Sequence, residues 1–214
     1  MSIDTLGLRE QKKRETRQAI SDHATQLFLR RGFEKTTIAE IAAAARVAKM
    51  TVTNYFPRKE DLALDHHEVF VASLAAAVRE RAAGESALAA VRRSVLEAID
   101  GRDAVVGFTG TEFARMLADS PTLIARVRDL HEQRELALAG ALLAELGAPP
   151  DAVEAVTARA VAAQLAMAAQ LVFRELQSRT LNGQRDEDIA RALRPMAEQV
   201  FDLLEPSIGE YAVR

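Results

Sequence analysis

The sequence contains no cysteine and no tryptophan, and aromatic residues make up only 5% of its 214 residues. Without cysteine the chain cannot form disulfides, use a thiol nucleophile or bind zinc through thiolates. The 49% apolar content is supplied mainly by Ala, Leu and Val, a composition that favours helices over strands. Six prolines and ten glycines exclude a collagen-like or linker-like chain. These features predict an all-α protein.

Long apolar runs are also lacking. The longest nearly apolar stretch, residues 160–173, has 14 residues and includes Gln164 and Gln170, so it is too short and too polar to span a bilayer. The first residues lack the apolar centre of a signal peptide. We therefore expect a soluble, cytoplasmic protein with no membrane partner.

Common catalytic motifs are missing as well. The sequence has no G-x-G-x-x-G, no phosphate-binding P-loop, no G-x-S-x-G and no H-E-x-x-H. Of its four histidines, His66 and His67 are adjacent, and neighbouring helical residues point about 100° apart and do not readily share one metal. We expect no enzyme, no cofactor and no metal, with a metal-sensing role using Glu112 or Asp119 and a purely protein-binding scaffold as alternatives.

Charge is distributed unevenly along the chain. Residues 1–62 carry 12 Lys and Arg against 8 Asp and Glu, a net charge of +4, whereas residues 63–214 carry 16 against 23, a net charge of −7. All five lysines lie in the first segment. A basic N-terminal segment before an acidic one is typical of proteins that bind a polyanion through the basic segment. The alternative is that a net charge of +4 over 62 residues reflects only an ordinary solvated surface.

Apolar periodicity and end signals predict nine helices. Thr37 and Glu40 form a T-x-x-E capping box, and Ser120 precedes Pro121 as an N-cap before an N1 proline. The tight turn between the second and third helices is typical of a helix-turn-helix. The expected helices span approximately residues 9–31, 38–46, 49–56, 59–83, 86–99, 104–119, 121–147, 149–179 and 186–205.

The third helix has a polar face suited to DNA. If Val52 is at the centre of its buried face, Ala48 and Phe56 also point inward. The opposite, exposed face of the helix then carries Asn, Thr, Met and Lys side chains. Asn can bond an adenine edge, Thr and Met can contact a thymine methyl group, and Lys can reach guanine or phosphate. The Thr37 hydroxyl, Tyr55 and Lys59 are suited to phosphates. The alternative is a polar surface turn. The candidate DNA-binding residues are Thr37, Arg46, Lys49, Met50, Thr51, Thr53, Asn54, Tyr55 and Lys59.

Residues 32–62, GFEKTTIAEIAAAARVAKMTVTNYFPRKEDL, resemble the DNA-binding signature of TetR-family transcriptional regulators. The match includes Gly-aromatic-x-x-Thr-Thr, an Ile-Ala helix, Thr-aliphatic, Tyr-Phe and Lys-Glu-x-Leu. Four positions depart from it: Arg46 and Ala48 replace a usual turn Gly and Ser, Met50 replaces a common Gly, and Thr53 replaces a common Tyr. The last two face the groove, so the resemblance implies an operator different from those of better-matching relatives.

The resemblance implies a nine-helix, two-domain architecture. Residues 1–58 would form the helix-turn-helix DNA-binding domain, and residues 59–214 an effector-binding and dimerisation domain. The implied protein is a regulator, of repressor type, that binds a palindromic double-stranded DNA operator as a homodimer and is released by a small hydrophobic effector. The segment NYFPRKEDL also resembles the corresponding segment of a subset of the family linked to acyl-CoA-like ligands. We expect residues 1–8 to form a loose arm that contacts the minor groove.

The last two helices are suited to a dimer interface, because one is rich in alanine and the other carries a continuous apolar stripe. The alternative is the core of a monomer. Pro195 is expected to kink the last helix. The candidate interface residues are Ala162, Ala169, Ile189, Leu193, Met196, Val200 and Leu204.

A ligand pocket is expected among the middle helices, where bulky apolar residues alternate with isolated polar ones. Thr109, Arg115 and His131 are further polar candidates, and the segment 107–110 is expected to line a cavity or form a plain loop. For each of these residues an ordinary core or surface position is the alternative. The candidate effector-pocket residues are His66, Phe70, Phe108, Glu112, Phe113, Met116, Gln164, Met167 and Phe173.

Overall fold

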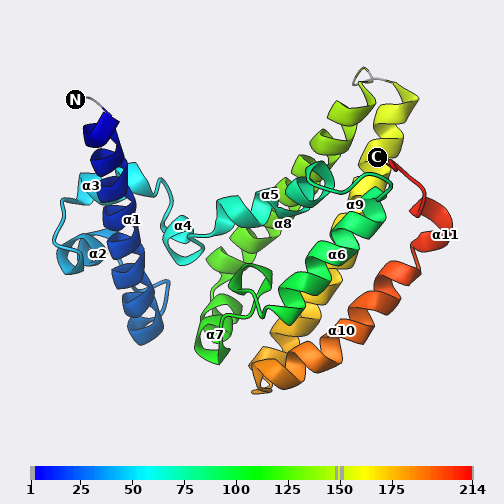
Figure 1. Cartoon of the computed structure of the whole chain (residues 1–214). Helices are drawn as coiled ribbons and strands as arrows, with labels where there is room; N and C mark the ends of the chain where they lie inside the picture. The colour runs from blue at the N-terminus through cyan, green and yellow to red at the C-terminus, as the bar shows by residue number, and fades with distance from the viewer. Residues whose placement is uncertain (1–2, 148, 150–151, 214) are drawn as a thin grey trace. The chain divides into compact units, whose positions relative to one another are not determined.

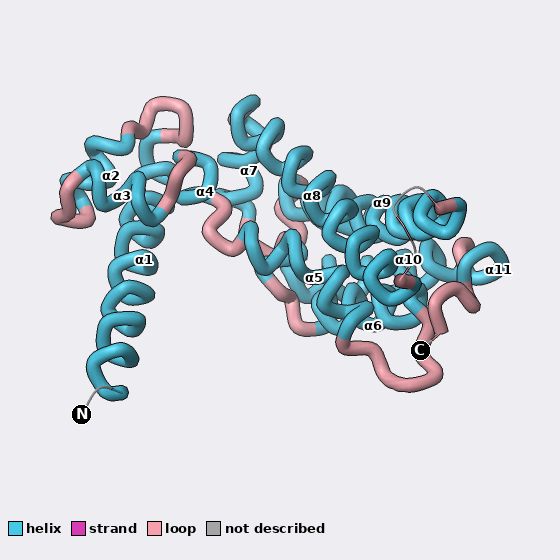
Figure 2. Tube along the Cα trace, turned by 90° about the horizontal axis from the view of Figure 1, so that it is seen from above, coloured by secondary structure: helices cyan, strands magenta, loops and turns pink. Residues whose placement is uncertain are grey.

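The computed structural model of the chain describes residues 3–147, 149 and 152–213, and the regular structure in these ranges is helical (Figure 2). The prediction of an all-α protein is confirmed. The elements are α1 (Ile3–Arg31), α2 (Ile38–Ala44), α3 (Lys49–Tyr55), α4 (Lys59–Ala63), α5 (His67–Arg79), α6 (Ala87–Asp100), the 3-10 turn η1 (Ala104–Val106), α7 (Thr111–Asp119), α8 (Pro121–Leu146), α9 (Val153–Leu181), α10 (Asp186–Asp202) and α11 (Glu205–Ile208).

The described residues form eleven α-helices, whereas the sequence predicts nine. The difference arises because the predicted helix 59–83 is divided into α4 and α5, and because the short helix α11 follows α10 at the end of the predicted helix 186–205. Leu64, after α4, has φ −115° and ψ 52°, outside the helical region. No glycine or proline marks this break, which falls where the polar residues 65–68 follow Leu64.

Two helix starts also differ from the prediction. The helix expected from residue 104 begins at Thr111, because Gly107 adopts a left-handed φ of 116° that ends the short turn η1. The first helix begins at Ile3, so the expected loose arm is wrong for residues 3–8. Met1 and Ser2 lie outside the described residues.

The chain divides into two compact units. The first comprises residues 1–65 and 115–126, and the second comprises residues 66–114 and 127–214. The first unit therefore includes α4 and a segment from the middle of the chain, beyond the predicted boundary at residue 58. The assignment of DNA binding to 1–58 and of effector binding and dimerisation to 59–214 stays a prediction.

The core of the first unit is built by α1, α2, α3 and α4 (Figure 1). Several of its large apolar side chains are at most 1% exposed, and burying each contributes about 1.5–3 kcal/mol relative to solvent exposure. They include Ile20 and Phe28 from α1, Ile41 from α2, Val52 from α3, Phe56 immediately after it and Leu62 from α4.

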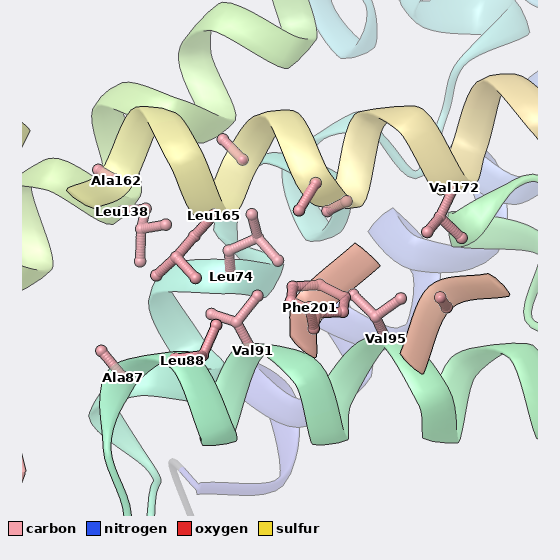
Figure 3. Close-up of a cluster of buried hydrophobic side chains, with 14 of the residues drawn as sticks. Leu74, Ala87, Leu88, Val91, Val95, Leu138, Ala162, Leu165, Val172 and Phe201 are labelled. Carbon is pink, nitrogen blue, oxygen red and sulfur yellow. The ribbon is translucent and has the colours of Figure 1, made fainter. Parts of the chain in front are cut away.

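The core of the second unit lies between α6 and α9, whose apolar side chains point toward one another (Figure 3). Phe201 of α10 and Leu74 of α5 fill the space between them, and both are fully buried. Alanines along α9, among them Ala162 and Ala169, allow its neighbours to approach closely. By length and composition alone α9 could cross a membrane, a test that core helices of soluble proteins also pass, and 44% of its most apolar window is buried within the protein.

Candidate nucleic-acid interface and ligand cavity

The capping box predicted at Thr37 is present at the start of α2. The Glu40 N–H donates to the Thr37 hydroxyl at 3.3 Å, and the Glu40 carboxylate accepts from the Thr37 N–H at 2.8 Å. The hydrogen bond from the Thr37 backbone and then that from its hydroxyl lower the pKa of Glu40. The Thr37 side chain, predicted to contact phosphate, is thus already engaged in starting the helix that precedes the turn.

The turn between α2 and α3 contains two unusual residues. Arg46 has a left-handed φ of 55°, a conformation that glycine adopts without steric cost and that costs other residues roughly 1–2 kcal/mol. Ala48 precedes α3 as an N-cap with no side-chain hydrogen bond, as expected from its lack of a hydroxyl. Its backbone is extended, with φ −69° and ψ 148°, and its side chain is exposed. The prediction that Ala48 packs inward is therefore wrong, because helical periodicity does not extend to a non-helical cap.

The face of α3 opposite Val52 is exposed, as its periodicity predicts. Met50 is 70% exposed, and the Thr53 hydroxyl donates to the Met50 carbonyl at 3.1 Å. The segment from Arg46 to Lys59 contains no acidic residue. The exposed candidates are Arg46, Lys49, Met50, Thr53 and Asn54, and the half-buried ones are Thr51, Tyr55 and Lys59.

Arg17 of α1 holds the end of α3, a role that the sequence did not reveal. Its Nη1 donates to the Tyr55 carbonyl at 2.9 Å, and its guanidinium carbon lies 4.3 Å from the centre of the Phe56 ring. A cation at a helix C-terminus is stabilised by the unpaired carbonyls there. Arg17 thus fixes the position of the proposed recognition helix.

Lys59 also makes internal contacts. Its Nζ donates to the carbonyls of Phe33 at 2.8 Å and Thr36 at 3.1 Å, and lies 4.1 Å from the centre of the Phe33 ring. Lys59 therefore joins the start of α4 to the loop between α1 and α2. Its predicted contact with a DNA phosphate stays a prediction.

A buried ion pair joins α4 of the same unit to α8. The Arg126 Nη2 lies 2.9 Å from the Asp61 Oδ1, and the two side chains are 9% and 8% exposed. The Arg126 Nε also donates to Asp61, at 3.2 Å. These hydrogen bonds compensate both charges in a place that water scarcely reaches.

The second unit contains a small apolar cavity between α5, α6 and α9. Its volume is about 10 Å³, enough for about one water molecule. Gly107 packs closely against Phe173, one of the lining residues, since a Cβ at Gly107 would meet the Phe173 ring at 3.2 Å and the Gln177 Nε2 at 2.8 Å. The lining residues are Phe70, Val95, Ile99, Val106, Arg134, Ala169, Val172, Phe173 and Leu176.

A larger cavity of about 170 Å³ lies between α8 and α9. Its lining residues are Arg128, His131, Glu132, Arg134, Glu135, Ala166 and Gln170. Arg134 lines both cavities. The His131 ring makes edge contacts with Phe70 and Phe173, each at 5.1 Å between ring centres. Burial, together with the smaller effects of the positive charges of Arg134 and Arg174, lowers the pKa of His131 to about 4. His131 is therefore neutral at pH 7.

Only two of the nine candidate effector-pocket residues, Phe70 and Phe173, line either of these cavities. Phe108 packs into the core, and Met116 is buried within the first unit. The other predicted residues lie at the surface or are half-buried, because their spacing did not show which helix face the neighbouring helices cover. They are His66, Glu112, Phe113, Gln164 and Met167, of which Met167 is 47% exposed.

The predicted interface residues fall into two groups. Ala162, Ala169, Ile189 and Leu193 are at most 4% exposed and pack into the core of their own unit. Met196 is 42% exposed, and Val200 and Leu204 are half-buried. Since a side chain already covered by its own chain offers no surface to a second copy, only the second group lies at the surface of α10 or just beyond its end.

Groups of three or more His, Asp or Glu side chains that could hold a metal ion are absent from the described part of the chain.

Three comparisons bear on this architecture. The family model for bacterial regulatory proteins of the tetR family matches residues 20–65. The HTH-type transcriptional regulator TcmR from Streptomyces glaucescens is 31% identical over 207 residues, covering 94% of this chain and 88% of TcmR.

Two solved structures have a similar fold. A TetR-family transcriptional regulator from Syntrophomonas wolfei superposes with a TM-score of 0.51 at 16% identity, covering 89% of this chain and 96% of the other. A structure described as an SmeT–triclosan complex superposes with a TM-score of 0.51 at 16% identity, covering 94% of each chain.

The chain belongs to the TetR family. It is a DNA-binding transcriptional regulator from a ligand-responsive family and is not an enzyme. The sequence-based recognition of this family from residues 32–62 is confirmed.

Proposed function

We propose that this protein is a repressor that binds a palindromic operator as a homodimer in the cytoplasm and is released from DNA by a small effector. The observation that carries the proposal is the exposed face of α3. It is free of acidic residues and is held by the buried Val52 on one side and by the Arg17 contact at its end. A helix held in this way can enter a major groove without reorganising.

Within that groove, Asn54 and Met50 are proposed to contact base edges, and Arg46 and Lys49 to contact phosphates. Phosphate contacts are independent of sequence and release counterions, so removing one cation lowers the slope of log affinity against log salt by about 1. Arg46 and Lys49 are better tests than Lys59, because the structure gives their side chains no internal role comparable to the Lys59 hydrogen bonds.

The test begins with selection of binding sites from a random duplex pool, followed by gel-shift titration at several salt concentrations. We expect Lys49→Met to weaken binding to all selected sequences and to lower the salt slope. Asn54→Ala should change preference at one base step, by roughly 1–3 kcal/mol. The control is Gln26→Ala, an exposed polar residue on α1, which should bind like the wild type. Wild-type behaviour of both α3 variants would refute the recognition-helix assignment.

The proposed dimer interface uses the exposed apolar residues of α9 and α10. Met167 and Leu171 are 47% and 46% exposed on α9, and Met196 and Leu203 are 42% and 74% exposed in α10 and just after it. The two helices pack side by side (Figure 1), and exposed apolar side chains are typical of association sites.

Leu171→Arg is expected to produce monomers in sedimentation experiments and to weaken operator binding, since a palindromic site needs both heads. Leu136→Arg is the matched control, because Leu136 is 60% exposed on α8, outside this surface. A wild-type mass for Leu171→Arg would exclude this interface. Leu193, which is 1% exposed, is a poor site for the experiment because a charge there would disrupt the core.

The effector is proposed to enter the second unit at the cavity beside His131. An acyl-CoA-like ligand, suggested by the NYFPRKEDL segment, is far larger than the 170 Å³ available and would require the helices to move apart. Thermal-shift screening of hydrophobic metabolites, acyl-CoA esters and drugs, followed by operator-release assays on each hit, tests this part of the proposal.

A further inference from the structure

Arg134 is a buried cation without a carboxylate partner in the described part of the chain. It is 4% exposed on α8, and its Nε donates to the hydroxyl of Ser73 at 2.9 Å. Its guanidinium carbon lies 4.5 Å from the centre of the Phe70 ring. A neutral hydroxyl and an aromatic face compensate a buried charge only in part.

In the other strongly buried arginines, a carboxylate compensates the buried positive charge. Arg126 is paired with Asp61, and Arg81 forms two 2.7 Å hydrogen bonds to the two carboxylate oxygens of Glu145. Burial without such a neighbour lowers the pKa of Arg134 to about 10, which still leaves it charged at pH 7. The guanidinium thus retains the capacity to bind an anion.

The space beside Arg134 suits a molecule with one ring. The cavity that it lines together with His131, Ala166 and Gln170 measures about 170 Å³. An engineered protein cavity of about 150 Å³ binds benzene, so a six-membered ring bearing one small group is the right size. The His131 ring lines this space and makes edge contacts with the rings of Phe70 and Phe173.

Two further features of the cavity restrict the charge of its occupant. The His131 Nε2 is buried and has no hydrogen-bond partner within the described residues. A neutral imidazole can donate one hydrogen bond to an oxyanion without adding charge. Arg128, Glu132 and Glu135 also line the cavity, so apart from Arg134 its lining carries one positive and two negative charges, and this excess negative charge repels a second anionic group.

We propose that this cavity binds a small organic monoanion, a carboxylate on a ring-sized apolar body, with the carboxylate on the Arg134 guanidinium and a further contact from His131. Guanidinium and carboxylate match in geometry and form paired hydrogen bonds. That such binding alters DNA affinity rests on the proposed function; the binding site itself does not.

The test uses the full chain without DNA and three probes: benzoate, the uncharged benzamide, and the dianion phthalate. Isothermal titration at constant ionic strength is expected to show benzoate binding about 10-fold or more tightly than benzamide, with phthalate weaker than benzoate. Equal affinity for benzoate and benzamide would overturn the proposal.

Two variants assign the effect to Arg134. Arg134→Met keeps the length and apolar stem of the side chain and should abolish the preference for benzoate over benzamide. Arg134→Lys, which keeps the charge but loses the planar fork, should retain part of it. Arg191→Met, at an exposed arginine of α10, is the matched control and should bind benzoate like the wild type. Undiminished benzoate preference in Arg134→Met would overturn the assignment, and Arg134→Lys gives the same test if the methionine variant does not fold.

Gel shifts on the same samples separate this inference from the proposed function. Normal DNA binding with no benzoate preference overturns only the anion site. Benzoate preference that depends on Arg134, in a protein that ignores duplex DNA, supports the site and overturns only the proposed repressor function.

Discussion

Arg126 and Arg134 lie eight residues apart on α8, one in the first compact unit and one in the second, and both are buried. Arg126 is paired with the carboxylate of Asp61, whereas Arg134 contacts the hydroxyl of Ser73 and the ring of Phe70. The first arrangement is complete without a ligand. The second leaves a charge uncompensated next to a cavity, which is the condition expected of a binding site.

The largest effect on stability should come from breaking the ion pair between Asp61 and Arg126. Asp61→Asn removes the carboxylate from a pair whose side chains are less than 10% exposed, so we expect unfolding free energy to fall by about 3 kcal/mol in urea titrations. The double variant Asp61→Asn/Arg126→Gln should recover part of this loss. A loss below about 1 kcal/mol would show that the pair is solvated.

Arg134→Met is the counterpart in the second unit. Replacing an uncompensated buried charge with an apolar side chain of similar shape is expected to leave stability unchanged or to increase it. A loss as large as that of Asp61→Asn would remove the distinction between the two arginines.

The second effect concerns pH and the other uncompensated group, His131. Its pKa is about 4 in the folded chain and about 6.5 when unfolded, so the unfolded state takes up the proton first as pH falls. The stability that the neutral ring contributes is complete above pH 6.5 and is lost progressively down to pH 4. Between pH 7.5 and 5.0 we expect a loss of about 2 kcal/mol from this residue.

Urea titrations at the two pH values measure this loss, and His131→Leu provides the reference. The wild type should lose more stability than the variant over the same interval. An identical loss in both proteins would mean that the His131 ring is reached by water.

The third prediction distinguishes a lysine that stabilises the first unit, Lys59, from a lysine that is proposed to contact DNA, Lys49. Lys59→Met removes two hydrogen bonds to backbone carbonyls, so we expect a loss of about 1.5 kcal/mol in unfolding free energy. Lys49→Met, at an exposed lysine, should leave stability unchanged while lowering the salt dependence of DNA binding. If Lys59→Met is as stable as the wild type, the Lys59 amine is not needed to hold the loop between α1 and α2.

The smallest effect is a gain. Arg46→Gly relieves the left-handed φ of 55°, and we expect it to raise stability by about 1 kcal/mol or less, since glycine also loses more freedom on folding. Arg46→Ala removes the same charge but keeps the strain, so it should show no gain. Equal melting temperatures for the two variants would mean that the turn relaxes without cost.

The sequence predicted the first unit more completely than the second. Val52 and Phe56 could be assigned to the buried face of α3, and Thr37 to a capping box, because these features depend on residues close in sequence. Arg17 could not be assigned to the end of α3, since 38 positions separate it from Tyr55.

The second unit was predicted less well for the same reason. Apolar spacing shows that a helix has a covered face but does not show whether its own chain or another covers it. Ile189 and Leu193 were therefore predicted at an interface, although the structure packs them into the core. Met167 was predicted in a pocket, and the structure exposes it.

By itself, the sequence determined the helical class, the family and the polar face of α3, because helix periodicity, end signals and a contiguous motif are local properties. The tertiary structure alone decided which buried charges have partners. Asp61 reaches Arg126 across 65 positions, while Arg134 meets no carboxylate among the described residues, and both outcomes depend on which side chains packing brings together.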